Sequence, residues 1–145
     1  MTTTDARAVP GSAQAERRIA VPLVASVVLG AATLYTALAD PYRAGFFPSC
    51  IYLATTGHWC PGCGGLRAVH ELARGDLGAA LGMNPVVVLL VIPLVLALLV
   101  AWWRAGWRGR AAPAIPMWAA VALPVGLGAF WVLRNIPALE PFLAP

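Results

Sequence analysis

Two cysteines separated by two residues are the feature of this sequence with the most distinctive chemistry. Cys60 and Cys63 lie in a Cys-Pro-Gly-Cys-Gly segment, and the remaining cysteine, Cys50, precedes Cys60 by ten residues. The two-residue spacing lets both thiolates reach one metal ion. Gly64 permits the tight turn that points backbone N–H groups at sulfur. The pattern is typical of a zinc-binding knuckle, and we predict that the three cysteines form one local cluster.

A structural zinc site needs four ligands, usually Cys and His side chains in a tetrahedral arrangement. Besides the three cysteines, the chain offers His58 and His70 close to the motif. Either histidine can supply the fourth ligand, and we place His70 with the cysteines as a weaker ligand than they are. Two turns of helix advance about 11 Å, so His70 reaches the sulfurs only if its helix folds back across the knuckle. Zinc is the cofactor that this set indicates, and the sequence carries no other cofactor motif.

Three other interpretations of the cysteines stay open. A Cys-x-x-Cys pair can cycle between dithiol and disulfide, and a helix starting after Cys63 would stabilise a thiolate. The chain has no thioredoxin-like βαβ pattern, however, which counts against a free-standing oxidoreductase. Alternatively, two of the cysteines form a structural disulfide in an oxidising compartment and leave the third free. In the last interpretation the thiols are simply buried.

The segment after the knuckle is predicted to be a short surface helix. Residues 66–74 carry an apolar stripe and are followed by Gly75, a residue typical of the position after a helix end. Arg67, His70 and Glu71 share another face of this helix, at spacings of three and four. When each residue is considered alone, we expect Arg67 to pair with Glu71 or with a lipid phosphate, and we expect His70 to be a solvated surface residue.

A second short helix and a membrane span should follow. Asp76 is predicted to cap a helical segment over residues 77–83. Asn84 is a good N-cap, and Pro85 suits the first helical position of the span that comes next. Pro93 lies within that span and should disturb its helix.

Three apolar runs without charges are long enough to cross a membrane. At 1.5 Å per residue, such runs span the roughly 30 Å hydrocarbon core. The predicted spans cover residues 19–39, 85–103 and 111–133. We therefore predict an all-α integral membrane protein whose cysteine-containing loop, residues 46–84, lies between the first and second spans.

Composition supports this fold class and excludes others. The 145 residues are 60% hydrophobic and 11% charged, whereas soluble domains contain about 25% charged residues. We expect a disordered tail over residues 1–15 and one membrane domain over residues 16–145. The ten positive charges are all arginine and flank the apolar runs, so they suit a lipid bilayer and not nucleic acid.

The beginning of the chain has a second interpretation. Arg17-Arg18, the apolar run and Ala39 resemble a secretory signal that is cleaved before Asp40. Signal sequences usually have apolar cores of about 7–15 residues, and this run is longer. We therefore expect a retained first span with the N-terminus in the cytoplasm.

The arginine distribution predicts the orientation. With the N-terminus inside, six arginines lie on the cytoplasmic side and four on the outer side, which favours an extracytoplasmic cysteine loop. The inner six are Arg7, Arg17, Arg18, Arg104, Arg108 and Arg110, and the outer four are Arg43, Arg67, Arg74 and Arg134.

The motif segment resembles the signature of a family of small bacterial membrane proteins of unknown function. The matching positions outside Cys50, Cys60 and Cys63 are Gly57, Pro61, Gly62, Gly64, Arg67, Asn84 and Pro85. Two positions depart from that signature: Ile51 stands where proline is common, and Leu66 stands where threonine is common. The resemblance implies a multi-pass protein of the bacterial plasma membrane and assigns no activity.

The sequence favours a non-enzymatic function. It has no paired intramembrane carboxylates and no charges that would form a conduction path. We predict an accessory or assembly subunit whose cysteine-stabilised loop contacts a partner membrane protein. A membrane thiol–disulfide oxidoreductase using Cys60 and Cys63 is the alternative. A transporter is disfavoured, because three spans contain no inverted repeat.

Overall fold

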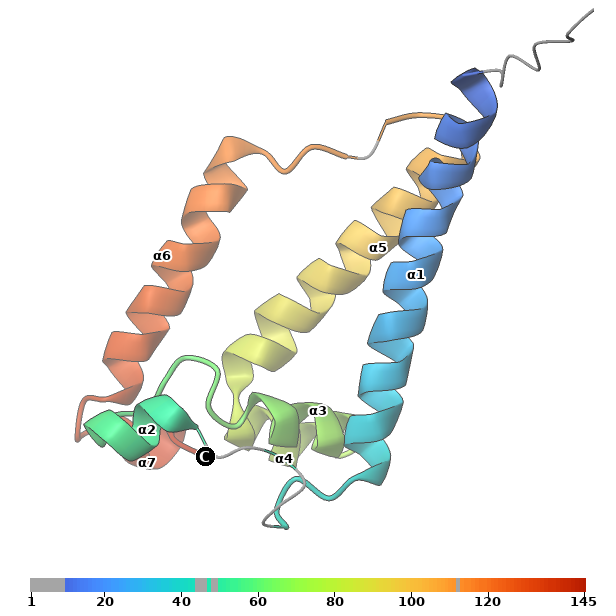
Figure 1. Ribbon diagram of the computed structural model, residues 1–145. Coiled ribbons are helices and arrows are strands. Elements are labelled where there is room, and N and C mark those ends of the chain that lie inside the picture. The colour runs from blue at the N-terminus through green and yellow to red at the C-terminus, as the bar shows by residue number, and fades with distance from the viewer. Residues whose placement is uncertain (1–9, 44–46, 48–49, 112) are drawn as a thin grey trace, which may run out of the picture.

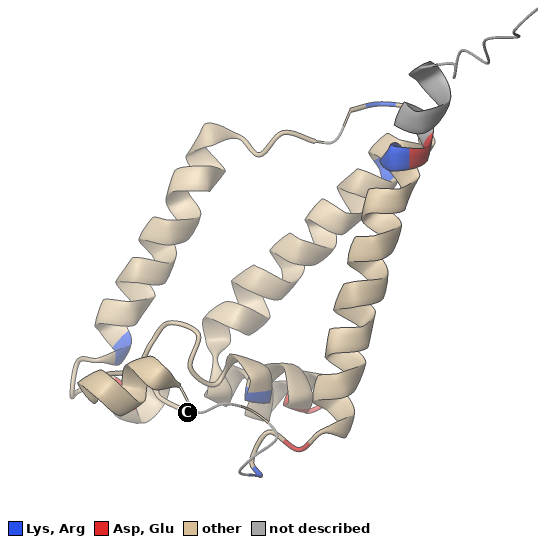
Figure 2. Cartoon of the chain, in the orientation of Figure 1, with Lys and Arg blue, Asp and Glu red and all other residues tan. Residues whose placement is uncertain are grey.

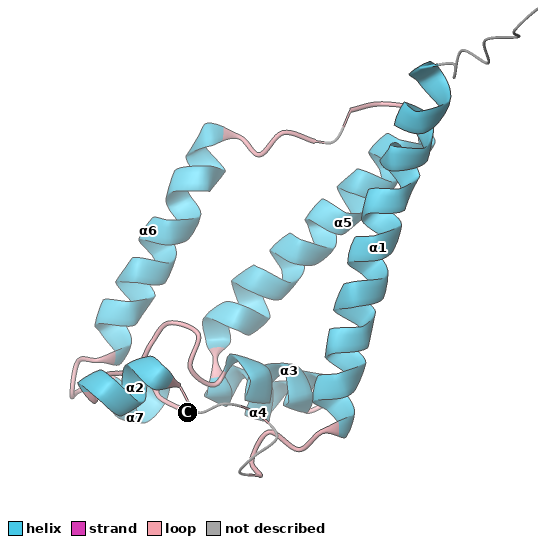
Figure 3. Ribbon diagram, in the orientation of Figure 1, coloured by secondary structure: helices cyan, strands magenta, loops and turns pink. Residues whose placement is uncertain are grey.

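The computed structural model describes residues 10–43, 47, 50–111 and 113–145. This part of the chain is helical and contains no strand (Figure 3). Its elements, in chain order, are α1 (Pro10–Leu38), α2 (Ile51–Thr56), α3 (Gly65–Ala73), α4 (Leu77–Met83), the π-helical η1 (Val87–Val91), α5 (Ile92–Trp107), α6 (Met117–Arg134) and α7 (Glu140–Leu143).

Three of the helical stretches are long and apolar enough to cross a membrane. They are Glu16–Leu38, Val87–Trp107 and Met117–Arg134. The short helices α2, α3, α4 and α7 gather at one end of these spans (Figure 1). The predicted all-α membrane fold is confirmed, and the cysteine-containing segment lies between the first and second spans.

The first helix starts earlier than the sequence indicates. α1 begins at Pro10, inside the segment 1–15 that the composition assigns to a disordered tail. Proline suits the first turn of a helix, and it starts this one six residues before the predicted boundary. Residues 1–9 lie outside the described part of the chain.

The third span starts later than the uncharged run. The sequence predicts it from residue 111, whereas α6 begins at Met117. Pro116 has φ −65° and ψ 145°, an extended conformation, and it precedes the first helical residue. Proline restricts its own φ and disfavours a helical residue before it, so Pro113 and Pro116 keep the chain extended here.

The first two spans pack against each other, and a glycine lies at their contact. A Cβ atom on Gly106 of α5 would lie 2.7 Å from the backbone oxygen of Arg18 in α1. Deeper in the pair, the Trp103 indole N–H donates to the hydroxyl of Ser26 at 3.0 Å. Figure 1 shows α6 standing apart from α1 and α5 and joined to the α2–α7 end. The third span is therefore held mainly through its end.

The second span begins as the sequence predicts. The Asn84 side-chain oxygen accepts the backbone N–H of Val87 at 3.0 Å, with Pro85 as the first helical residue. The first turns are π-helical over Val87–Val91, directly before Ile92 and Pro93. A π-helical turn is a common way to accommodate an interrupted hydrogen-bond ladder. The helix disturbance expected at Pro93 is therefore a π-helical turn.

The short helices α3 and α4 form a compact corner against the start of the second span. Gly75, at φ +86°, ends α3, and Asp76 then caps α4 by accepting the Ala79 N–H at 2.8 Å. Both features were predicted from residue type. The buried apolar residues of this corner, with those packed against them, are Ala68, Ala80, Val88, Leu72, Leu81 and Met83. The corner provides the support on which the cysteine knuckle rests.

Candidate metal centre

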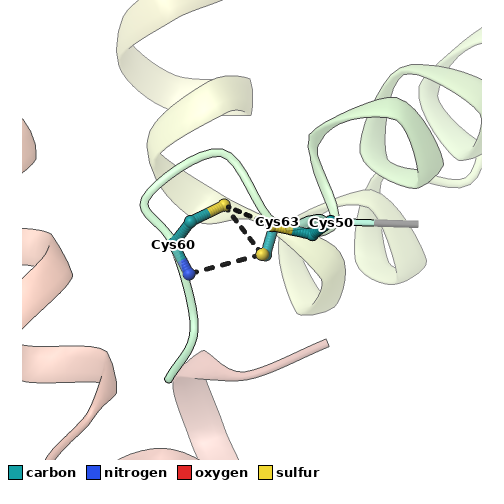
Figure 4. A group of neighbouring side chains, drawn as sticks. All are labelled: Cys50, Cys60 and Cys63. Atoms are coloured by element: carbon teal, nitrogen blue, oxygen red, sulfur yellow. Dashed lines mark hydrogen bonds between the residues drawn. The ribbon is translucent and has the colours of Figure 1, made fainter. Parts of the chain in front are cut away.

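The three cysteines converge on one point, which confirms the predicted cluster (Figure 4). The sulfurs of Cys60 and Cys63 are 2.7 Å apart, and those of Cys50 and Cys60 are 3.4 Å apart. All three sulfurs lie within 4.8 Å of one another. Both measured separations exceed the bond length of about 2.05 Å in a disulfide, and all three thiols are free. Three convergent thiols of this kind can share one metal ion.

Two glycines bring the cysteines together. Cys50 is the residue before α2, and Gly57 ends that helix at φ +72° by donating its N–H to the Leu53 carbonyl. This left-handed turn sends the chain back toward Cys50. Gly64, at φ +78°, then ends the Cys-x-x-Cys turn and starts α3. Positive φ is accessible to glycine at little cost, so both residue types follow from the path of the backbone.

Gly64 is also enclosed by distant parts of the chain. A Cβ atom at this position would lie 2.5 Å from the backbone oxygen of Met83 and 2.8 Å from Cβ of Pro145. The end of α4 and the last residue of the chain therefore close directly over the knuckle. Because both the space and the backbone angle exclude a side chain, the knuckle accepts only glycine here.

The turn also shows the predicted N–H···S contact. The backbone N–H of Cys60 points at the sulfur of Cys63 with an N···S distance of 3.3 Å (Figure 4). By itself this bond favours a thiolate at the Cys63 sulfur, but burial of the thiol outweighs it.

Asn84 ties the knuckle to the second span. Its side-chain N–H groups donate to the carbonyl oxygens of Pro61 and Cys63, both at 3.0 Å. Its side-chain oxygen accepts the Val87 N–H, and the residue is fully buried. The amide thus uses both ends: the oxygen caps the membrane helix and the nitrogen holds the turn. An aspartate could perform only the first role.

Arg134 ties the same turn to the third span. Its Nη1 atom donates to the carbonyl oxygens of Cys60 and Cys63 at 2.8 and 3.2 Å. The side chain is fully buried, with its guanidinium carbon 4.9 Å from the ring centre of Phe130. The Nε and Nη2 atoms are also buried and find no hydrogen-bond partner among the described residues. A cation with spare donors therefore lies beside the cysteine cluster.

The next residue, Asn135, completes the attachment through Trp59. The Asn135 side chain accepts the Trp59 N–H at 2.8 Å and donates to the Trp59 carbonyl at 2.9 Å. The Trp59 indole N–H donates to Glu140 of α7 at 3.0 Å. Trp59 therefore binds the C-terminal segment at both its backbone and its indole ring.

Sequence reasoning missed the role of the C-terminal residues. It treats Arg134 as one of four outer charges and gives Asn135 no role. A signal was present in the sequence, because Arg134 and Asn135 are neighbours at the end of a span and each carries several N–H donors. Such a pair can bind the backbone carbonyls of a neighbouring turn.

The structure does not bring His70 to the cysteines. His70 is buried, and its Nδ1 donates to the backbone carbonyl of Thr36 at 2.7 Å. That carbonyl lies in the last turn of α1, where helical partners run out, so His70 caps the first span. With Nδ1 as the donor, Nε2 is left to accept from Arg74, whose Nη1 lies at 3.3 Å. The expected solvated surface histidine is therefore a buried helix cap.

The other histidine also lies elsewhere. His58 is exposed and its Nδ1 contacts the carbonyl of Thr56 at 2.8 Å. Among the described His, Cys, Asp and Glu side chains, the group close enough to share a metal ion at this site consists of the three cysteines. The candidate ligand set therefore consists of the three cysteines, without the predicted histidine.

Arg67 has a different partner from the one expected. Its guanidinium lies 4.9 Å from the ring centre of Tyr42, and the Tyr42 hydroxyl donates to Glu71 at 2.8 Å. Burial, followed by the neighbouring Glu71, raises the pKa of Tyr42. Tyr42 thus links two residues that the helix spacing predicts as a direct pair.

The thiols of Cys50 and Cys63 differ in acidity. The backbone N–H of Leu53, in the first turn of α2, lowers the pKa of Cys50. Burial, reinforced by hydrogen bonds from the other two thiols, raises the pKa of Cys63 to about 12. Near neutral pH, Cys50 is therefore the more available thiolate, and Cys63 keeps its proton unless a cation replaces it.

Fold and site together define a small membrane protein with three candidate spans and a three-thiol cluster at one end of them. Residues 50–102 match the family described as "Protein of unknown function (DUF2752)". This match confirms the resemblance to a family of unknown function. It begins at Cys50, includes Asn84 and ends before α6, so Arg134 lies outside it. Neither a curated protein nor a solved structure matches the chain.

The two roles of Asn84 can be separated by an isosteric exchange. Asn84→Asp keeps the helix cap but places an oxygen against the Pro61 and Cys63 carbonyls. We expect a loss of about 2–3 kcal/mol in the free energy of unfolding, because two buried acceptors lose their donor. Chemical unfolding in detergent micelles, followed by tryptophan fluorescence, measures the change.

Asp76→Asn is the matched control, since Asp76 caps α4 by accepting one N–H and is exposed. Its cost should stay within about 1 kcal/mol, because asparagine and aspartate are comparable caps. Equal stability of Asn84→Asp and the unchanged chain would show that the Asn84 amide does not hold the knuckle.

Proposed function

We propose that this protein is a zinc-binding, non-enzymatic accessory subunit of a bacterial plasma-membrane assembly. In this proposal Cys50, Cys60 and Cys63 hold the ion as thiolates. The ion fixes the knuckle against the ends of the second and third spans. The resulting rigid end of the molecule contacts a partner membrane protein.

The observation that carries the proposal is the buried charge of Arg134. A buried guanidinium is costly unless a negative group compensates it. Its hydrogen bonds go to two neutral carbonyls, and two of its nitrogens have no partner among the described residues. Three thiolates around a divalent cation carry one net negative charge. The single positive charge of Arg134 balances it, whereas three neutral thiols would leave the arginine uncompensated.

The donor set supports zinc among the divalent ions. Thiolates are soft ligands that select zinc over magnesium or calcium, which prefer oxygen. Zinc would bring the three sulfurs into one fixed arrangement and leave one coordination position for water or for a ligand from the partner. A non-enzymatic role agrees with the attachment of the knuckle to both the second and the third span, through Asn84 and Arg134, which limits its movement.

A thiol–disulfide oxidoreductase is the second candidate, and one observation favours it. The Cys60 and Cys63 sulfurs are 2.7 Å apart, so little motion would join them. Joining them would release two electrons and two protons to an oxidised partner disulfide, which would become a dithiol. The absence of a thioredoxin-like βαβ pattern counts against it.

Metal analysis distinguishes the two candidates. We expect about one zinc per chain in protein purified in detergent without chelators, measured by elemental analysis together with thiol counting. Cys60→Ser and Cys63→Ser should each remove most of the zinc and lower protein abundance, because loss of a structural metal destabilises small modules. His70→Gln serves as the control and should keep its zinc.

A chain without zinc that carries a Cys60–Cys63 disulfide, identified by mass spectrometry after thiol alkylation, would replace this proposal with the oxidoreductase.

We propose an orientation with the N-terminus in the cytoplasm and the cysteine cluster outside. The arginine count in the sequence is six inside against four outside. The burial of Arg134 against the knuckle removes it from the exposed outer charges and leaves three. Figure 2 places the described inner arginines at the end of α1 and α5 that lies away from the cysteines. The difference between six inner arginines and three exposed outer ones supports this orientation under the positive-inside rule.

An impermeant maleimide applied to intact cells tests the orientation. After reduction and chelation we expect labelling of Cys50, which is partly exposed and has a lowered pKa. Labelling that requires permeabilised cells would reverse the orientation.

A further inference from the structure

A second charged site lies at the opposite end of the molecule. Arg17 and Arg18 of α1 come together with Arg104, Arg108 and Arg110, which lie at and just after the end of α5 (Figure 2). The nearby acidic side chain in the sequence is Glu16. The ion pair found among the described residues joins Arg43 to Asp40, at the cysteine end. Among the described residues, these five arginines form no ion pair and therefore present a concentrated positive charge.

Two adjacent cavities lie among these arginines. The first, of about 290 Å³, is lined by Arg17, Arg18 and Arg110 together with apolar Val21 and Trp102. The second, of about 500 Å³, is lined by Arg104, Arg108 and Arg110, and its apolar wall includes Ala97 and Val100. Arg110 belongs to both cavities. Each one is lined by three arginines and has an apolar wall that continues toward the membrane span.

The helix crossing fixes the position of these arginines. Gly106 lies so close to the Arg18 backbone that a Cβ atom would approach its oxygen to 2.7 Å. The Arg18 guanidinium donates to the carbonyl of Gly109, which ends α5 at φ +62°. The first cavity is therefore formed by the packing of α1 on α5, whereas the second lies between α5 and the segment that follows it.

We propose that this end binds the phosphate groups of an anionic phospholipid. Guanidinium groups bind phosphate oxygens in bidentate fashion, and basic pockets between membrane helices suit anionic headgroups. Trp102 and the apolar walls suit the glycerol and upper acyl region, where aromatic residues are enriched. Two cavities that share Arg110 fit a lipid with two phosphates, so diphosphatidylglycerol should bind more tightly than phosphatidylglycerol. The cysteine site plays no part in this proposal.

Thermal unfolding in neutral detergent, with defined lipids added, tests the proposal. Diphosphatidylglycerol should raise the unfolding temperature at a lower concentration than phosphatidylglycerol. Phosphatidylcholine and inorganic phosphate should leave it unchanged. Arg104→Gln and Arg110→Gln should each weaken the apparent affinity for the anionic lipid by about fivefold, the effect expected for one arginine near an anionic lipid.

Arg43→Gln, the same change at the cysteine end, is the matched control and should keep the affinity of the unchanged chain. Native mass spectrometry of the unchanged chain gives a reading that needs no variant, with anionic phospholipid expected to remain bound. Equal stabilisation by phosphatidylcholine would overturn the proposal. So would stabilisation by inorganic phosphate alone, or an equal loss in Arg43→Gln.

Discussion

The carbonyls of Pro61 and Cys63 take their donors from outside the Cys60–Cys63 turn, and this need organises the rest of the structure. Within the turn, the Cys63 N–H donates to the Cys60 carbonyl at 3.1 Å, and the Gly65 N–H donates to the Gly62 carbonyl at 2.9 Å. Buried carbonyls left unpaired are costly. Asn84 and Arg134 supply the donors from the second and third spans. Because α6 stands apart from α1 and α5, the bonds of Arg134 to the knuckle and of Asn135 to Trp59 fix the position of the end of the third span relative to the other two. The knuckle thus connects the start of the second span to the end of the third.

Much of the architecture follows from local rules and could be predicted from sequence. Apolar runs of sufficient length give the spans, and Gly75, Asp76, Asn84 and Pro85 mark helix ends through properties that neighbouring residues do not change. The cysteine cluster was also predictable, because the Cys-x-x-Cys turn fixes two sulfurs. The start of α6 was predicted wrongly, since a count of uncharged residues does not register that Pro116 keeps the backbone extended.

The partners of buried polar groups could not be predicted, because they depend on which helix ends meet in space. His70 has the chemistry of a zinc ligand, but it lies beside the last turn of α1 and caps the Thr36 carbonyl. Arg134 has the sequence position of a charge at a span end, but it points inward to the knuckle. In both cases residue type limits the possible roles, and tertiary contact chooses among them.

The central claim is that the clamped knuckle holds zinc through its three thiolates, with Arg134 balancing the charge. X-ray absorption at the zinc edge, on the purified chain, tests it most directly. The account predicts a shell of three sulfur atoms at about 2.3 Å and one lighter ligand atom at about 2.0–2.1 Å. A first shell made of nitrogen and oxygen alone would contradict it, since the ion would then lie away from Cys50, Cys60 and Cys63.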